Sequence, residues 1–270
     1  MSALATLIAA AALLPGFHQV AAGPHGGLIE TGTFPGETRP GLVYLPPGFT
    51  RSRTYPVVYL LHGMPGSPSE YVSGTDLAGF ADSGIVSGAI PPFLAVLPAA
   101  GPANRYNGEW AGPIATALVD EIVPWVDANL PTIATPRARV IAGLSAGGFG
   151  AVDIGLHHLD VFGTIESWSG YFRPLHDGWL EHASLQTLAA NDPTKLAPAL
   201  GATLRRDRTR FFLSSGPAHS HWFKPAQTSA FAHELRGVGV PVSYHFYSQT
   251  HGEWRSQVDT GLAWALRLAP

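Results

Sequence analysis

Ser145 is the residue of this sequence whose surroundings most directly indicate chemistry. It stands at the centre of a G-x-S-x-G segment, residues 143–147. A short apolar run, Arg139 to Ala142, precedes this segment, and Gly148 to His157 predicts a helix after it. A strand, a sharp turn and a helix in this order push one serine hydroxyl clear of the sheet, where it can act as a nucleophile. The alternative interpretation is a glycine-rich turn that merely contains a serine.

The glycines of this segment have a steric role. The turn is tight, so a Cβ at residue 143 or 147 would crowd the neighbouring strand and helix. The start of the following helix favours the negative charge that develops when a nucleophile attacks a carbonyl group. The segment therefore favours acyl transfer through Ser145.

A serine nucleophile needs a general base, and His251 is the candidate. It follows the apolar run Val242 to Tyr247 and precedes the last predicted helix, so it lies on a loop at the carboxyl end of a strand. Ligands collect at that edge of open α/β sheets, and the order of a Ser-acid-His triad ends with histidine. The chain has 12 histidines, and of these only His219 and His221 have a spacing that could suit a metal. Two histidines on a loop are weak evidence for zinc, so we expect no metal and no cofactor.

The remaining apolar and amphipathic runs predict the elements that position these residues. Strands alternate with helices, which predicts a mostly parallel sheet with helices on both faces. The strands are expected at Leu28–Phe34, Gly41–Leu45, Tyr55–Leu61, Phe93–Leu97, Thr164–Trp168, Arg210–Leu213 and Val242–Tyr247, and further helices at Ala115–Ala128, Gln227–Gly237 and Trp254–Leu268.

Composition agrees with one folded domain of this class. The chain has 270 residues, of which 46% are apolar and 13% charged, and its net charge is −3. No basic block is present, so nucleic acid is not expected as a partner. There is no cysteine, which excludes disulfides, thiolate nucleophiles and cysteine zinc sites.

Residues 1–25 form a separate segment ahead of a single domain, residues 26–270. The alanine-rich run Leu4 to Leu14 is too short to span a bilayer alone. It is similar to the apolar region of a secretory signal, with small residues at Val20 to Ala22 for cleavage, although no basic residue precedes it. It could equally be the end of a membrane segment or an ordinary packed helix. We expect an extracytoplasmic protein, secreted or associated with a membrane through this segment.

Five motifs in order resemble the esterase branch of the α/β-hydrolases, which includes esterase D-like enzymes, feruloyl esterases and mycolyltransferases. The resemblance runs from about Tyr44 to the C-terminus. The motifs are LLHG at 60–63, DEIVPW at 120–125, GLSAGG at 143–148, the stretch from Phe162 to Ser169-Gly170, and THGEW at 250–254. Together they imply the α/β-hydrolase fold, and they are less specific for a substrate.

The resemblance also locates an oxyanion hole. One donor would be the backbone N–H of Ala146, the residue after the nucleophile. In this family the second donor comes from the residue after the His-Gly pair of an early loop, which here is Met64. The alternative for residues 62–66 is a plain turn after a buried strand.

The acid of the triad is where this sequence departs from the family. The family pattern places a carboxylate at position 219, but this chain has His219. An imidazole cannot hold the imidazolium of His251 as a carboxylate does. Some α/β-hydrolases carry their acid after the preceding strand, and Asp177 is the nearest carboxylate to that point. A serine–histidine dyad without an acid is the alternative.

Aromatic residues near the strand ends predict an aromatic-walled pocket for an acyl or aryl ester. Trp110 and Trp222 are the expected substrate-binding residues, with Phe223 beside the second. Each could instead pack under a loop. The functional prediction is a serine carboxylesterase acting on a small-molecule or lipid ester through an acyl-enzyme on Ser145. Transfer of the acyl group to a sugar or lipid hydroxyl, and a non-catalytic binding role, are the alternatives.

Overall fold

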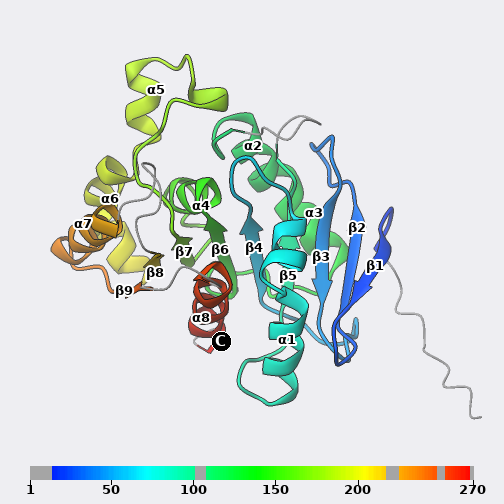
Figure 1. Cartoon of the computed structure of the whole chain (residues 1–270). Helices are drawn as coiled ribbons and strands as arrows, with labels where there is room; N and C mark the ends of the chain where they lie inside the picture. The colour runs from blue at the N-terminus through cyan, green and yellow to red at the C-terminus, as the bar shows by residue number, and fades with distance from the viewer. Residues whose placement is uncertain (1–13, 101–107, 217–224, 248–252, 268–270) are drawn as a thin grey trace, which may run out of the picture.

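A single nine-stranded sheet runs through the molecule (Figure 1). The computed structural model describes residues 14–100, 108–216, 225–247 and 253–267. Its strand order is β1-β2-β3-β5-β4-β6-β7-β8-β9. The strands are β1 (His18–Ala22), β2 (Leu28–Gly32), β3 (Gly41–Leu45), β4 (Val57–Leu61), β5 (Leu94–Leu97), β6 (Arg139–Leu144), β7 (Thr164–Trp168), β8 (Arg210–Ser215) and β9 (Val242–Phe246).

The order of the strands reverses at β4. From β5 to β9 all neighbouring strands are parallel, whereas β1, β2 and β3 form an antiparallel edge. The chain leaves β4 for β5 on one side and returns to β6 on the other. Every residue of β4 and β6 is buried, as expected for central strands covered on both faces. Such a reversal creates a crevice at the carboxyl ends of the strands, where α/β proteins bind ligands.

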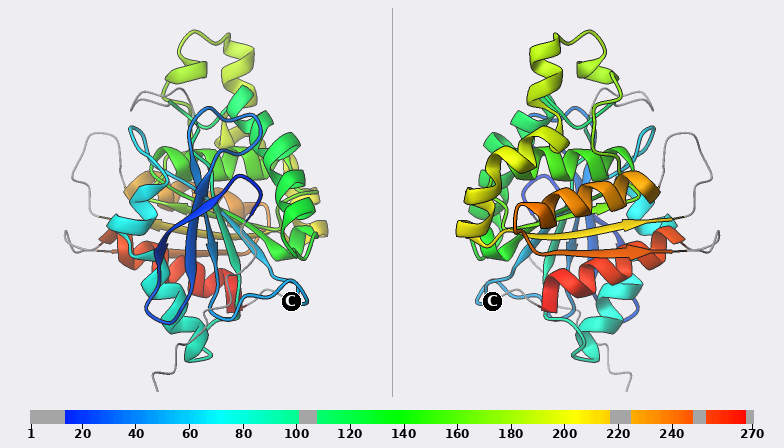
Figure 2. Two further views of the ribbon diagram at one scale, coloured as in Figure 1. Left: turned by 90° about the vertical axis from the view of Figure 1, so that its right-hand side faces the viewer. Right: turned by 90° about the vertical axis from the view of Figure 1, so that its left-hand side faces the viewer.

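Helices cover both faces of the sheet, which confirms the fold class expected from the sequence (Figures 1 and 2). Helices α1 and α8 pack on one face, and α3, α4, α6 and α7 on the other. The helices are α1 (Leu77–Val86), α2 (Pro113–Thr116), α3 (Val123–Asn129), α4 (Ala146–His157), α5 (Leu185–Ala190), α6 (Pro193–Asp207), α7 (Pro225–Gly237) and α8 (Glu253–Arg267).

The helix expected at Ala115–Ala128 is present but irregular in the middle. A π-helical stretch, η2 (Ala117–Ile122), joins α2 to α3. Pro124 lies in the first turn of α3 and has no N–H to donate to the preceding turn. A wider turn accommodates the proline ring without ending the helix.

The N-terminal boundary differs from the one expected. Residues 18–22, placed by the sequence in the segment ahead of the domain, form β1 and pair with β2. The buried carboxylate of Asp82 in α1 holds the turn between these strands by accepting the N–H groups of His25 and Gly27. The Tyr44 hydroxyl donates to the same carboxylate. The folded sheet therefore begins before residue 26.

Glu166 is a fully buried carboxylate on the α8 face of β7. The indole N–H of Trp168 donates to Glu166 Oε2 at 3.1 Å, and α8 approaches so closely that a Cβ at Gly261 would overlap both groups. Glu166 Oε1 has no hydrogen-bond partner among the described residues. Burial raises the pKa of Glu166 from 4.5 to about 8, although the positive charge of Arg210 opposes the shift.

Glu166→Gln is expected to change how stability depends on pH. A carboxyl group whose pKa is higher in the folded state binds a proton more readily there, so its contribution falls as pH rises from about 4.5 to about 8. The wild-type free energy of unfolding should decrease over this interval relative to the variant, by on the order of a few kcal/mol at most. Urea unfolding of both proteins at pH 5 and pH 8.5 measures the difference.

Glu181→Gln is the matched control, because the Glu181 side chain is largely exposed. The control should follow the wild-type pH dependence. Parallel pH curves for wild type and Glu166→Gln would contradict the prediction.

Candidate active site

Ser145 occupies a sharp turn between β6, which ends at Leu144, and α4, which begins at Ala146. Its backbone has φ 55° and ψ −115°, a conformation that residues other than glycine rarely adopt. The Ser145 N–H donates to the Trp168 carbonyl at 3.0 Å, which fixes the turn to the end of the neighbouring strand β7. The strand, turn and helix expected from the sequence are all present.

The glycines of the turn are required because backbone meets backbone there. A Cβ at Gly143 would overlap the backbone of Gly147, and one at Gly147 would overlap the Leu61 carbonyl at the end of β4. A Cβ at Gly148 would lie 2.7 Å from the Ser167 hydroxyl. The start of α4 therefore fits against β4 and β6 only without side chains at these positions.

The loop after β4 lies beside this turn, and hydrogen bonds to His62 hold it in place. The indole N–H of Trp110 donates to the His62 carbonyl at 3.0 Å. His62 Nε2 is 2.9 Å from the carbonyl of Ala99, two residues after β5, and burial lowers the pKa of the His62 imidazole. Both contacts fix the backbone that leads into Gly63 and Met64.

Met64 and Ala146, the two expected oxyanion donors, contact the same small apolar cluster. Met64 packs partly buried against it, and Ala146 is one of its buried members. The cluster also includes Phe149, and Tyr171, which stacks on it with ring centroids 5.0 Å apart. The structure thus brings the early loop and the turn at Ser145 together.

A cavity of about 410 Å³ opens beside Ser145. Its lining comes from the loop after β4, from the π-helical turn η1 (Glu70–Gly74), from the end of β6 and from the start of α8. The lining residues are Gly63, Met64, Pro65, Glu70, Gly74, Thr75, Leu144, Ser145 and Trp254.

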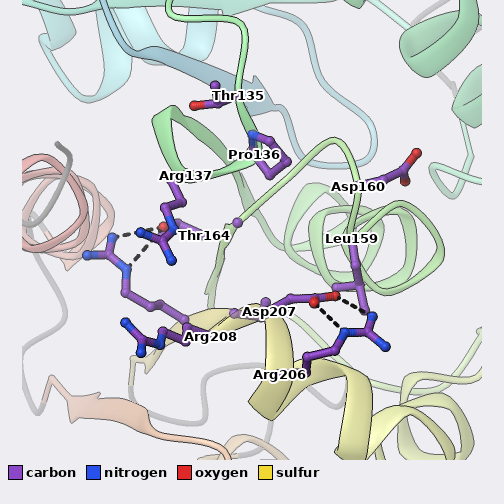
Figure 3. Close-up of a pocket in the computed structure, with 12 residues that line it drawn as sticks. Thr135, Pro136, Arg137, Leu159, Asp160, Thr164, Arg206, Asp207 and Arg208 are labelled. Carbon is purple, nitrogen blue, oxygen red and sulfur yellow. Dashed lines mark hydrogen bonds and ion pairs between the residues drawn. The ribbon is translucent and has the colours of Figure 1, made fainter.

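A larger cavity, of about 850 Å³, lies at the other end of the strands (Figure 3). Arg137, Arg206 and Arg208 border it, and Arg206 pairs with Asp207 at 2.8 Å. These residues precede β6 and β8, whereas Ser145 follows β6. This cavity therefore does not contain the candidate nucleophile.

Trp110 does not line the cavity beside Ser145, although the sequence suggested a substrate-binding position. Its side chain is buried behind the loop, where its N–H bonds to the His62 carbonyl. A Cβ at Gly150 would overlap it, so α4 packs directly against its ring. Trp110 supports the loop from this position.

Several residues singled out in the sequence lie outside the described residues. These are His251, His219, Trp222 and Phe223. The described chain on either side of His251 is β9 and α8, and Tyr247 donates its N–H to the Ser215 carbonyl at the end of β8. The loop that carries His251 thus begins at the same edge of the sheet as Ser145.

Asp177 lies in the segment between β7 and α5, directly before a short 3₁₀ turn (Gly178–Leu180). Its carboxylate accepts the N–H of Gly178 at 2.5 Å and caps this turn. Its own N–H donates to Glu109 Oε2 at 3.3 Å. The role of Asp177 as the triad acid remains a prediction.

Glu109 is a buried residue that sequence analysis did not single out. Its carboxylate accepts the N–H of Leu175 at 2.6 Å as well as that of Asp177. Burial raises the pKa of Glu109, while these backbone donors oppose the shift. Glu109 ties the segment around Asp177 to the loop after β5, a long-range contact with no local sequence signal.

A buried polar network ties α8 to the ends of β7 and β8. Gln257 Oε1 accepts the hydroxyl groups of Ser169 and Ser214 at 3.1 and 2.7 Å. The Gly216 N–H donates to the Ser169 hydroxyl at 3.0 Å. Gln257 therefore fixes the helix that follows His251 relative to the strand ends. The sequence offered one indication of this network, because Gln257 is a glutamine among the apolar positions of an amphipathic helix.

The described residues contain no group of three His, Cys, Asp or Glu side chains placed to hold a metal ion. Within the same ranges, every helix is too short or too polar to cross a bilayer.

The parallel sheet, its reversal at β4 and the strained turn at Ser145 together define the α/β-hydrolase fold. The sequence profile of the family described as "Putative esterase" matches residues 33–265. The chain therefore belongs to this esterase family, and the resemblance stated from its motifs is confirmed.

Two proteins with sequence similarity carry esterase names. An esterase of Mycobacterium tuberculosis (strain ATCC 25618 / H37Rv) is 35% identical over 138 residues, covering 48% of this chain and 29% of that protein. An endo-1,4-beta-xylanase/feruloyl esterase of Xylanibacter ruminicola is 31% identical over 138 residues, covering 47% and 19%. The matched region thus spans less than a third of either relative.

A solved ferulic acid esterase has the same fold. It superposes with a TM-score of 0.72 at 21% identity, and the match covers 93% of this chain and 99% of that one. The likeness confirms the α/β-hydrolase architecture over nearly the whole chain.

Gly147→Ala is expected to destabilise the protein strongly, because the new Cβ would overlap the Leu61 carbonyl and neither backbone can move independently of the sheet. We expect a loss of about 3 kcal/mol or more, or failure to fold. Thermal unfolding followed by circular dichroism measures this.

Gly63→Ala is the matched control, because its Cβ would meet nothing closer than 3.6 Å. It should fold with nearly the wild-type midpoint. Equal midpoints for wild type and Gly147→Ala would show that the turn does not need this glycine.

Proposed function

We propose that the protein is a serine carboxylesterase that uses Ser145 as its nucleophile and His251 as its general base. The observation that carries the proposal is the strained turn at Ser145, which lines a cavity at the end of β6. Backbone strain of this kind is retained at functional sites more often than elsewhere. Membership of the esterase family supports the same chemistry.

The proposed reaction forms and breaks one acyl-enzyme. The Ser145 hydroxyl oxygen bonds to the ester carbonyl carbon while its proton passes to His251. The tetrahedral intermediate then expels the alcohol, which takes the proton from His251. Water attacks the acyl-enzyme with His251 again as base, and the acid is released with Ser145 restored.

Two backbone N–H groups, those of Ala146 and Met64, would stabilise the negative oxygen of each intermediate. Ala146 is the first residue of α4, so the partial positive charge of that helix end adds to its effect. The first turn of α4 contains no acidic side chain to oppose it. The support of the Met64 loop by Trp110 fits this role, because an oxyanion donor acts through its fixed position.

The substrate would be a small-molecule or lipid ester that enters the cavity beside Ser145. That cavity holds about 410 Å³ and is lined mostly by apolar groups, a size suited to an acyl or aryl portion. The name of the Xylanibacter ruminicola relative includes feruloyl esterase, which favours an aromatic ester. Trp222 remains the candidate for an aromatic contact from the loop after β8.

The proposed place of action is outside the cytoplasm. Its support is the alanine-rich apolar run Leu4 to Leu14 ahead of the sheet. Membrane association through this run would concentrate the enzyme near lipid esters.

Ser145→Ala and His251→Ala are each expected to lower p-nitrophenyl ester hydrolysis by on the order of 10³-fold or more. The double variant should be scarcely worse than either, because the two residues act as one unit. Steady-state kinetics on the four proteins measures this, and fluorophosphonate labelling of wild type should be lost in Ser145→Ala.

Thermal unfolding provides the control, since the Ser145 hydroxyl contributes little to packing and its removal should leave the midpoint nearly unchanged. Folded wild type that neither labels nor hydrolyses would favour a non-catalytic role. Losses that add strictly in log rate would show that His251 does not act with Ser145.

Asp177→Asn tests the acid of the proposed triad. The amide can still cap the turn at Gly178 but cannot stabilise an imidazolium, so kcat should fall about tenfold or more with KM little changed. His219→Asp in the Asp177→Asn background should restore part of the loss. An unchanged kcat in Asp177→Asn would leave a serine–histidine dyad, with His219 or water as its orienting group.

A further inference from the structure

One charged group lies in the lining of the cavity beside Ser145. Of the described residues that line it, only Glu70 carries a carboxylate or a basic group. The others are glycines, a proline, apolar side chains, the indole of Trp254 and two hydroxyl groups. A charge in such surroundings acts on a bound ligand more strongly than the same charge in water.

The Glu70 carboxylate and the Ser145 side chain both lie next to Gly63. An ideal Cβ built on Gly63 would lie 3.6 Å from Ser145 Cβ and 3.8 Å from Glu70 Oε2. The Gly63 N–H donates to Glu70 Oε2 at 3.4 Å, a long hydrogen bond that leaves most of the carboxylate's acceptor capacity unused. The space next to Gly63 is therefore bordered by both Ser145 and a carboxylate.

In the described part of the chain, the Glu70 carboxylate is not paired with a cation. None of the ion pairs between described residues includes Glu70. His62 is the nearby imidazole, and its burial favours the neutral form. As far as the described residues go, a substrate group that enters this space therefore meets a carboxylate that no cation pairs with.

We propose that Glu70 determines the charge preference of the enzyme. It would favour esters that carry a cationic group near the scissile bond, disfavour esters with an anionic group there, and act little on neutral esters. The inference rests on the proposed function, since it assigns a substrate class to the cavity beside Ser145. Glu70 contacts substrate in this role and takes no part in bond making.

The test uses esters that are closely matched in shape and differ in the charge of one tetrahedral terminal group. In the acyl series these are the p-nitrophenyl esters of 4-(trimethylammonio)butanoate, 5,5-dimethylhexanoate and 4-sulfobutanoate. In the alcohol series they are the butanoate esters of choline, 3,3-dimethylbutanol and 2-hydroxyethanesulfonate. The two series cover both portions of an ester that could enter the cavity.

Wild type should prefer the cationic over the anionic ester in at least one series. Glu70→Gln keeps the shape of the side chain, so it should lower kcat/KM for the cationic ester and raise it for the anionic one. Each change should be about tenfold, as expected for a partly exposed charge a few ångströms from the ligand. The neutral ester should change by less than about twofold, and Glu70→Lys should reverse the preference.

Opposite changes for the two charged esters cannot arise from a distorted oxyanion loop, which would lower all three rates together. An equal loss for all three esters, or an unchanged cation-to-anion ratio in both series, would overturn the proposal. Glu181→Gln, an exposed carboxylate on the segment above the sheet, is the matched control and should leave the ratio unchanged.

The neutral ester separates this inference from the proposed function. If its hydrolysis survives in Ser145→Ala, the proposed nucleophile is wrong. If its hydrolysis depends on Ser145 but the charge ratios do not depend on Glu70, only the present inference fails.

Discussion

Direct contact between backbones at the start of α4 is the constraint on which the active site depends. The first turn of this helix meets the end of β4 and the end of β6 with no side chain between them. That contact holds Ser145 in its strained conformation and also places the loop after β4 beside it. A single packing arrangement thus positions both the candidate nucleophile and the candidate oxyanion donors. This contact explains why glycine is needed at neighbouring positions that have no proposed chemical role.

The elements around this contact could be predicted because their sequence signals are local. Continuous apolar runs fix the central strands, as at Tyr55–Leu61, where β4 is buried on both faces. The G-x-S-x-G segment is recognisable because its glycines avoid a steric overlap between residues that are close in sequence. A Cβ at Gly143 would overlap the backbone of Gly147. The elements that the sequence did not reveal have weaker local signals. Helix α1 contains Gly79 and Gly84, and α6 contains an internal proline.

The parts of the site that could not be predicted depend on contacts between distant residues. Glu109 accepts hydrogen bonds from Leu175 and Asp177, 66 and 68 residues later in the chain. Gln257 meets Ser169 and Ser214 from a helix late in the chain. Trp110 was expected to bind substrate, but its indole N–H bonds to the His62 carbonyl and its side chain does not line the cavity beside Ser145. A sequence can show which residues lie near the end of a strand. It shows much less readily in which direction each of their side chains points.

The position of β4 in the sheet has a consequence for the order of folding. β4 pairs with β6, although β5 and the helices that cover it lie between them in the chain. The central parallel pair therefore closes a long loop, and such pairing is slow compared with local helix formation. Because the turn at Ser145 is shaped only when the backbone of β4 is already against it, we expect the candidate nucleophile to be positioned late in folding. On the ribosome, this turn can therefore take shape only after β6 and α4 have emerged, and the loop that carries His251 emerges later still.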